Sequence, residues 1–236
     1  MGKTKRNPKP QQIKSTHDPE VLHADAARYA KEAVKLGATD ATPIKASQII
    51  IDERVRAKCM IPKCFGYGGS AHCPPYALSV EDVKSLVAGF NWGVLLKIEV
   101  DPHLMSGYSM LEVDANLRAG REDPNASSLK QLTQAYRLMF SLVGDIESMA
   151  FYDGYHLATG FGAGSCQWIF CYDKGCQVIE KGTCRFPLRS YPSMESCAMD
   201  VYRTVTNVGW TIYPLGMRCD VSEVKHGTIV GLVLLD

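Results

Sequence analysis

Nine cysteines stand out in the 236-residue sequence, and seven of them fall into two groups. The second group along the chain has four cysteines within nineteen residues, separated by four, four and seven residues. A [4Fe–4S] cluster takes four thiolates, one for each iron. Structural zinc sites favour closer pairs, with about two to four residues between ligands. The spacing therefore favours an iron–sulfur cluster, with zinc as the alternative, on Cys166, Cys171, Cys176 and Cys184.

The first group has only three cysteines, Cys59, Cys64 and Cys73, separated by four and eight residues. Prolines follow the last of them, as in bacterial ferredoxin motifs. The candidates for a fourth ligand are Cys197, Cys219, His72 or a group from outside the protein. Cys197 and Cys219 each fit an ordinary buried cysteine better, and His72 fits a hydrogen-bonding or structural role. An iron without a protein ligand would be open to a small substrate or a thiolate.

Glycines accompany both groups, and cations surround the second. Small residues let backbone amides approach the sulfur atoms of a cluster and donate hydrogen bonds that tune its potential. We therefore expect this role for the glycines next to the cysteines, which are Gly66, Gly68, Gly69, Gly160, Gly162 and Gly164.

The composition indicates the cellular compartment and argues against several classes of function. An odd number of cysteines without an apparent export signal argues against a disulfide framework and predicts a reducing, cytoplasmic location. The formal net charge of +1 gives no electrostatic footprint for nucleic acid. The apolar runs are too short to span a membrane. No P-loop, HExxH motif or nucleophile elbow is present in the sequence.

The elements that must position the cysteines alternate between helices and strands. Asp18 and Pro19 are typical of a helix start, and Ser79 with Asp82 resembles a capping box. Apolar residues at helical spacing predict a long helix over residues 127–151. Further helices are expected at 19–36, from Ser79 onward, at about 110–118 and from the cap residue Ser193 to about 208. Strands are expected at 43–51, 92–100, 155–159, 211–214 and 228–235.

This alternation predicts an α/β or α+β sandwich, with a mixed sheet flanked by helices and two cysteine-rich loops that bind the clusters. Residues 1–16 are expected to form a flexible basic tail, and residues 17–236 a single domain. Cys73 and Cys184 are each followed by prolines, a capped helix and a Trp-containing strand start. The domain is therefore a candidate for two related halves, at about residues 40–105 and 155–235.

The same cysteine segments carry a family resemblance. They include Cys59 to Tyr76, which ends in Cys-Pro-Pro-Tyr, and the stretch from Gly162 through Cys184-Arg-Phe-Pro to Pro192-Ser-Met-Glu195. Through these residues the chain resembles the predicted metal-binding protein family called domain of unknown function 2284, from about residue 25 to 215. The resemblance implies that all seven grouped cysteines bind metal, as iron–sulfur. The second group is spaced more widely here than in the family, and Cys197 replaces a residue that is usually not cysteine.

Three functions follow from these sites. The leading hypothesis is electron transfer to or within a redox enzyme system by two [4Fe–4S] clusters. Its partner would be a redox protein or a larger enzyme complex, with no nucleic acid and no membrane involved. The second hypothesis is an enzyme whose three-cysteine cluster activates a substrate at an open iron, and the third is a zinc-stabilised interaction protein. No catalytic residue is identified from the sequence.

Overall fold

The computed structural model describes residues 9–14 and 16–235. Most of the predicted basic tail therefore lies outside the described residues. Residues 9–14 are exposed and have no regular secondary structure. The backbone amide of Gln11 donates to the carbonyl oxygen of Tyr152 at 2.8 Å, which holds this stretch beside the end of a long helix.

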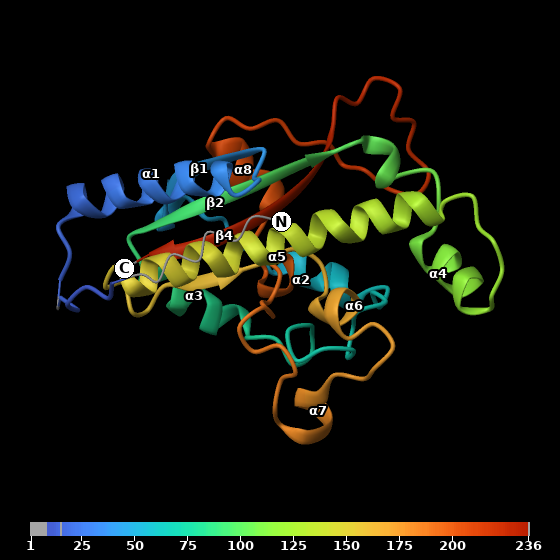
Figure 1. Cartoon of the computed structure of the whole chain (residues 1–236), viewed down its shortest axis with the longest axis horizontal. Coiled ribbons are helices and arrows are strands. Elements are labelled where there is room, and N and C mark those ends of the chain that lie inside the picture. Colours follow the sequence, from blue (N-terminus) through green and yellow to red (C-terminus); the bar gives the residue numbers. More distant parts are fainter. Residues whose placement is uncertain (1–8, 15, 236) are drawn as a thin grey trace.

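A four-stranded sheet lies at the centre of the fold, with strand order β1-β2-β4-β3 (Figure 1). The long strands β2 and β4 form its middle, and Leu96 pairs with Gly231. The predicted α+β class is confirmed. All neighbouring strands run antiparallel, although a mixed sheet was expected. The strands are β1 (Asp40–Lys45), β2 (Trp92–Val100), β3 (Thr159–Phe161) and β4 (Gly227–Leu235).

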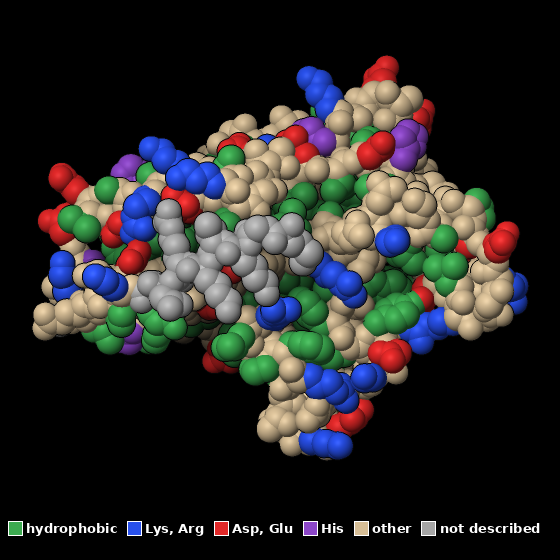
Figure 2. All heavy atoms as spheres, viewed as in Figure 1, with side chains coloured by type: hydrophobic (Ala, Val, Ile, Leu, Met, Phe, Trp, Pro, Cys, Tyr) green, Lys and Arg blue, Asp and Glu red, His purple; other side chains and the backbone are tan. Residues whose placement is uncertain are grey.

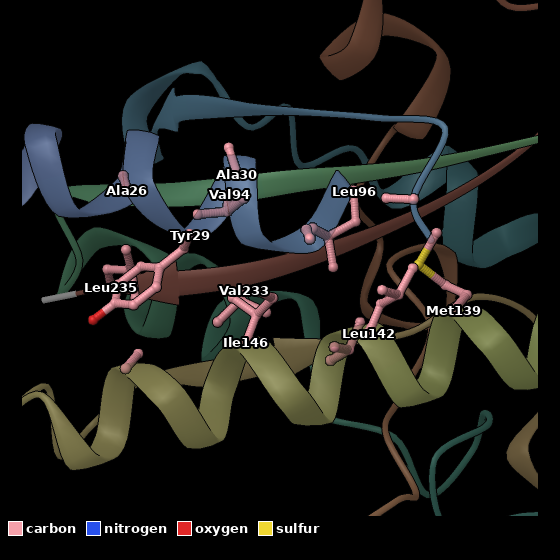
Figure 3. Packing of buried hydrophobic residues seen from close by; sticks show 14 of the residues in the cluster. Ala26, Tyr29, Ala30, Val94, Leu96, Met139, Leu142, Ile146, Val233 and Leu235 are labelled. Carbon is pink, nitrogen blue, oxygen red and sulfur yellow. The ribbon is translucent and has the colours of Figure 1, made fainter. Parts of the chain in front are cut away.

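Two long helices cover one face of the sheet, α1 (Pro19–Lys35) and α5 (Ala126–Tyr152). The Asp18 side chain caps α1, as predicted, by accepting hydrogen bonds from the amides of the first turn. Figure 3 shows Tyr29 of α1 and Ile146 of α5 directed toward the sheet strands. The larger hydrophobic core of the protein lies in this layer.

Two shorter helices cover the opposite face, α3 (Val80–Ala88) and α8 (Val201–Asn207). The capping box predicted at Ser79 is present. The prediction of one helix over residues 193–208 is wrong. A 3-10 turn, η3 (Glu195–Cys197), is followed by Ala198 at φ 60°, and α8 begins only after the cap residue Asp200.

The remaining helices lie in connections. The segments expected as cysteine loops contain three short helices, and the strand predicted at 211–214 has no regular structure. The strand predicted at 43–51 ends at Lys45, and the one predicted at 155–159 begins only at Thr159. These further elements are η1 (Ala46–Gln48), α2 (Glu53–Met60), η2 (Pro102–Leu104), α4 (Met110–Arg118), α6 (Cys166–Phe170) and α7 (Gln177–Lys181).

Each half of the sheet is built by the same succession of elements. A long helix leads to an edge strand, then a cysteine segment, a capped short helix and a central strand. The first half runs through α1, β1, α3 and β2, and the second through α5, β3, α8 and β4. This order is what two related halves would produce, and their relation stays a prediction.

The segment that contains α7 projects from the rest of the molecule (Figure 1). Lys and Arg side chains gather on this projection in Figure 2. Within the described residues, no helix is both long and apolar enough to cross a membrane.

Candidate metal centres

The first cysteine segment begins on α2, where Asp52 caps the helix and Cys59 lies in its last turn. The chain then turns back on itself, because Met60 forms an isolated bridge with Lys63. The amide of Cys64 donates to the carbonyl oxygen of Cys59 at 3.0 Å. The turn therefore returns Cys64 to the end of the helix that carries Cys59.

Cys73 joins this pair through the glycine-rich loop. The amide of Gly68 donates to the carbonyl oxygen of Pro74 at 2.7 Å, which closes the loop. A Cβ on Gly66 would lie 3.5 Å from the Cys73 sulfur, and the Gly66 amide donates to the Cys64 sulfur at 3.4 Å. Burial raises the pKa of Cys73 to about 11, and nearby Cys166, Cys64 and Cys59 also raise it. The three cysteines of the first group thus share one neighbourhood.

The four cysteines of the second group line one cavity. Counted with the space open to solvent, the cavity measures about 370 Å³. Cys166 is the first residue of α6, and Cys176 immediately precedes α7. The amide of Phe186 donates to the Cys184 sulfur at 3.3 Å. The complete cysteine lining of the cavity is Cys166, Cys171, Cys176 and Cys184.

Three residues of the first segment, Ser70, Ala71 and His72, also line the cavity of the second group. The hydroxyl of Ser70, which is buried, lies 3.2 Å from the Cys166 sulfur. Nδ1 of His72 lies 3.6 Å from the same sulfur and 3.3 Å from the Ser190 hydroxyl. Burial lowers the pKa of His72, which favours its neutral ring. His72 therefore lies beside the second group, whereas in the sequence it was one candidate for the fourth ligand of the first group, with a hydrogen-bonding or structural role preferred.

The two centres are contiguous. The Cys73 thiol donates to the Ser165 hydroxyl at 3.7 Å, and Ser165 immediately precedes Cys166. Phe65 also packs edge-on against Trp168, with 5.3 Å between the ring centroids. Contacts between the first segment and α6 therefore join the neighbourhood of the three-cysteine group to that of the four-cysteine cavity.

The other two cysteines lie in different surroundings. Cys197 is fully buried in η3, which packs against α2. Burial raises the pKa of its thiol to about 11, and charge on Cys73 contributes to the shift. Cys219 is partly exposed, and its thiol donates to the carbonyl oxygen of Gly216 at 3.0 Å. Of the two, Cys197 is the one within electrostatic range of the first group.

A family model described as "Predicted metal-binding protein (DUF2284)" matches residues 42–235. The chain belongs to this family. No curated protein and no solved structure matches it. The matched range of this DUF2284 chain includes all nine cysteines and both centres.

The donor set of this DUF2284 chain is dominated by thiols, which suit zinc and iron–sulfur clusters. Among the described residues, no group of three or more His, Cys, Asp and Glu side chains is arranged to hold a single metal ion. In a four-iron cluster each thiolate binds a different iron, so its ligands stand farther apart than ligands of one ion. The four cysteines line one cavity of the described chain without the close grouping that one ion requires.

Arg56 is a site residue that the sequence did not indicate. Its guanidinium donates to the carbonyl oxygens of Ala77, at 3.2 Å, and Leu78. These bonds tie α2 to the chain that leaves Cys73. Its positive charge also lowers the pKa of Cys59 and Cys197, although burial is the largest influence on both and raises them. Arg56 thus favours the thiolate forms that bind metal.

The glycines divide into two roles. Gly66 brings a backbone amide to a cysteine sulfur, as expected. A Cβ on Gly160 would lie 2.5 Å from Val143, and one on Gly162 would lie 2.8 Å from Phe140. Both neighbours belong to α5. These two glycines therefore let β3 and the chain after it lie close to α5, instead of serving the cysteines directly.

Proposed function

We propose that this protein binds two [4Fe–4S] clusters and transfers single electrons between a redox partner and a second acceptor. The observation that carries the proposal is the cavity lined by four cysteines, in contact with the segment that holds three more. Clusters of this type, when bound, supply reversible one-electron chemistry. The nine free cysteines and the predicted metal binding of the family support this assignment over a disulfide framework.

The chain's own groups suit bound clusters of negative charge. Amides of Gly66 and Phe186 donate to cysteine sulfurs, one in each centre. Such N–H···S bonds stabilise negative charge on the sulfur and so favour the reduced form of a cluster. The guanidinium of Arg56 offsets negative charge near the first group. The 3.2 Å contact between Ser70 of the first segment and Cys166 of the second group supports the passage of electrons between clusters held by the two groups.

Metal and sulfide analysis of protein purified without oxygen tests the proposal. Two clusters require about eight irons and about eight sulfides per chain, and a visible absorption that bleaches with dithionite. Cys64→Ser should remove the iron of the first group, and Cys171→Ser should remove the iron of the second. A colourless protein with about one or two zinc ions would instead support a zinc-stabilised interaction protein. Unaltered iron in both variants would overturn the proposal.

A second candidate is an enzyme that activates a substrate at an open iron of the first cluster. The observation in its favour is that the segment itself supplies three thiols, of which Cys64 is exposed to solvent. A small thiol added to the reduced protein should then alter the electron paramagnetic resonance signal of the first cluster. An unchanged signal, with full iron content, would favour electron transfer alone.

A further inference from the structure

The turn that carries Cys64 is exposed along its whole length. All six residues from Met60 to Phe65 are exposed, and four of them are apolar or proline. Ile61 is 80% exposed, Phe65 53% and Met60 42%. Contiguous exposed apolar side chains mark surfaces that bind another molecule. The bridge between Met60 and Lys63 holds these side chains on one compact turn.

The charged residues nearest to this turn along the chain are cations. Residues 54–80 contain four cations, Arg54, Arg56, Lys58 and Lys63, and no acidic residue. Lys58 and Lys63 are exposed, and neither forms an ion pair with a carboxylate of the described residues. Lys63 lies 5.0 Å from the centre of the Tyr67 ring. An apolar centre with a basic rim is complementary to an acidic protein surface.

Cys64 connects this surface to the first centre. It is the one exposed cysteine among the nine, and it lies between Lys63 and Phe65. This step rests on the proposed function, because it takes Cys64 as a cluster ligand. A cluster held by Cys64 would have its nearest approach to solvent at this turn, where a partner could come close enough to exchange an electron.

We infer that the turn Met60–Phe65 is the docking surface for a small acidic protein that carries single electrons. The lysines would steer the carrier toward the turn, and the apolar side chains would form the dry centre of a small, short-lived interface. One electron leaves the reduced carrier and enters the cluster bound by Cys64. The carrier is oxidised by one electron, the cluster is reduced by one, and no covalent bond changes.

The test uses the full chain loaded with clusters and flavodoxin, an acidic flavoprotein, as the probe. Flavodoxin hydroquinone gives up one electron to become the semiquinone, and its flavin absorption reports the rate. The rate and the affinity are measured at about 50 mM and about 200 mM salt, where screening differs. The unaltered protein should bind more weakly and react more slowly at the higher salt.

The variant Lys58→Glu/Lys63→Glu reverses two charges beside the turn and should slow the reaction by about tenfold or more at low salt. The control Lys174→Glu/Lys181→Glu makes the same change beside the second group, at two exposed lysines, and should keep most of the rate. Ile61→Ser should weaken binding and leave its salt dependence unchanged, because it removes apolar contact alone. Reduction potentials of all variants are measured so that rates are compared at known driving force.

Three results would overturn the docking surface: no binding of flavodoxin at low salt, equal rates for the unaltered protein and the turn variant, or an equal or larger loss in the control. Each of these leaves the proposed function intact, provided that iron and sulfide are present in full. Absence of iron and sulfide would be seen before any partner is added, and it would reject the proposed function itself.

Discussion

The two cysteines outside the groups form a natural pair for comparison at the scale of single residues. Cys197 is buried against α2 and within electrostatic range of Cys73. The Cys219 thiol instead donates a hydrogen bond to the carbonyl oxygen of Gly216. If Cys197 supplies the fourth thiolate of the first cluster, Cys197→Ser loses the iron of that cluster, roughly half of the total. Iron and sulfide analysis of the purified variant measures the loss.

Cys219→Ser is the matched control and should keep its full iron content. Circular dichroism of both variants separates loss of a ligand from loss of the fold. Full iron in Cys197→Ser would show that the fourth ligand of the first cluster comes from outside the protein. Loss of iron in Cys219→Ser but not in Cys197→Ser would contradict the structure, in which the Cys219 thiol donates to the carbonyl oxygen of Gly216.

Ser70 and His72 of the first segment both contact the Cys166 sulfur, and the Ser70 hydroxyl is the nearer of the two. A metal-bound thiolate accepts hydrogen bonds, so the Ser70 hydroxyl 3.2 Å away would act as donor to Cys166. Removal of this bond by Ser70→Ala should shift the potential of the second cluster to more negative values. A redox titration followed by electron paramagnetic resonance measures the shift. Ser106→Ala, at another buried serine that donates to the carbonyl oxygen of Pro102, should leave both potentials unchanged.

The contacts among site residues could be predicted from the sequence only in part. The spacing of Cys166, Cys171, Cys176 and Cys184 predicted a group, and these residues do line one cavity. The position of Ser70 and His72 beside Cys166 could not be predicted, because it depends on how two segments about a hundred residues apart pack together. A local motif contains no information about such long-range contacts.

At the scale of elements, the close approach of β3 to α5 depends on glycines. A Cβ on Gly162 would lie 2.8 Å from the Phe140 ring, which is fully buried and packed. We predict that Gly162→Ala lowers the free energy of unfolding by about 1–3 kcal/mol, because a packed core does not accept the extra atom without strain. Denaturant unfolding monitored by circular dichroism measures the change.

Gly216→Ala is the control for this prediction. No atom lies within 4 Å of the position that its Cβ would occupy, and its φ is not in the left-handed region. The control should change stability by less than about 0.5 kcal/mol. Equal stabilities for Gly162→Ala and the unaltered protein would mean that α5 shifts to accommodate the methyl group.

Helices and strands could be predicted from the sequence where a cap residue or an apolar run marks where they begin and end. The cap residues Asp18 and Ser79 and the apolar run 92–100 each gave an element that the structure contains. The helix predicted from Ser193 failed because Met199 pairs with Ile51, and the amide of Asp52 donates to the carbonyl oxygen of Ala198. These contacts with a distant segment bend the chain before α8. The helix α2 was missed because no residue in it is buried, so it has no apolar stripe to detect.

At the scale of the whole molecule, the cysteine segments lie outside the main hydrophobic cores. Those cores fill the two faces of the sheet beneath α1 and α5 and beneath α3 and α8. By contrast, α2 and α7 bury no residue, and a separate small cluster of Phe140, Cys166 and Ile169 anchors α6. The sheet and its helices therefore have their own source of stability, and the cysteine segments have little apart from the short contacts between them and any metal that they would bind.

This division predicts what removal of the metal does. Chelation of iron under mild oxidation should leave the far-ultraviolet circular dichroism spectrum nearly unchanged, because the sheet and the long helices keep their cores. Amide hydrogen exchange should accelerate by about tenfold or more in residues 54–78 and 164–190, where metal–ligand bonds replace a hydrophobic core. Exchange in β2 and β4, in the centre of the sheet, serves as the internal control and should stay slow. Global unfolding on loss of metal would contradict this division, since it would mean that the metal stabilises the sheet as well as the segments that bind it.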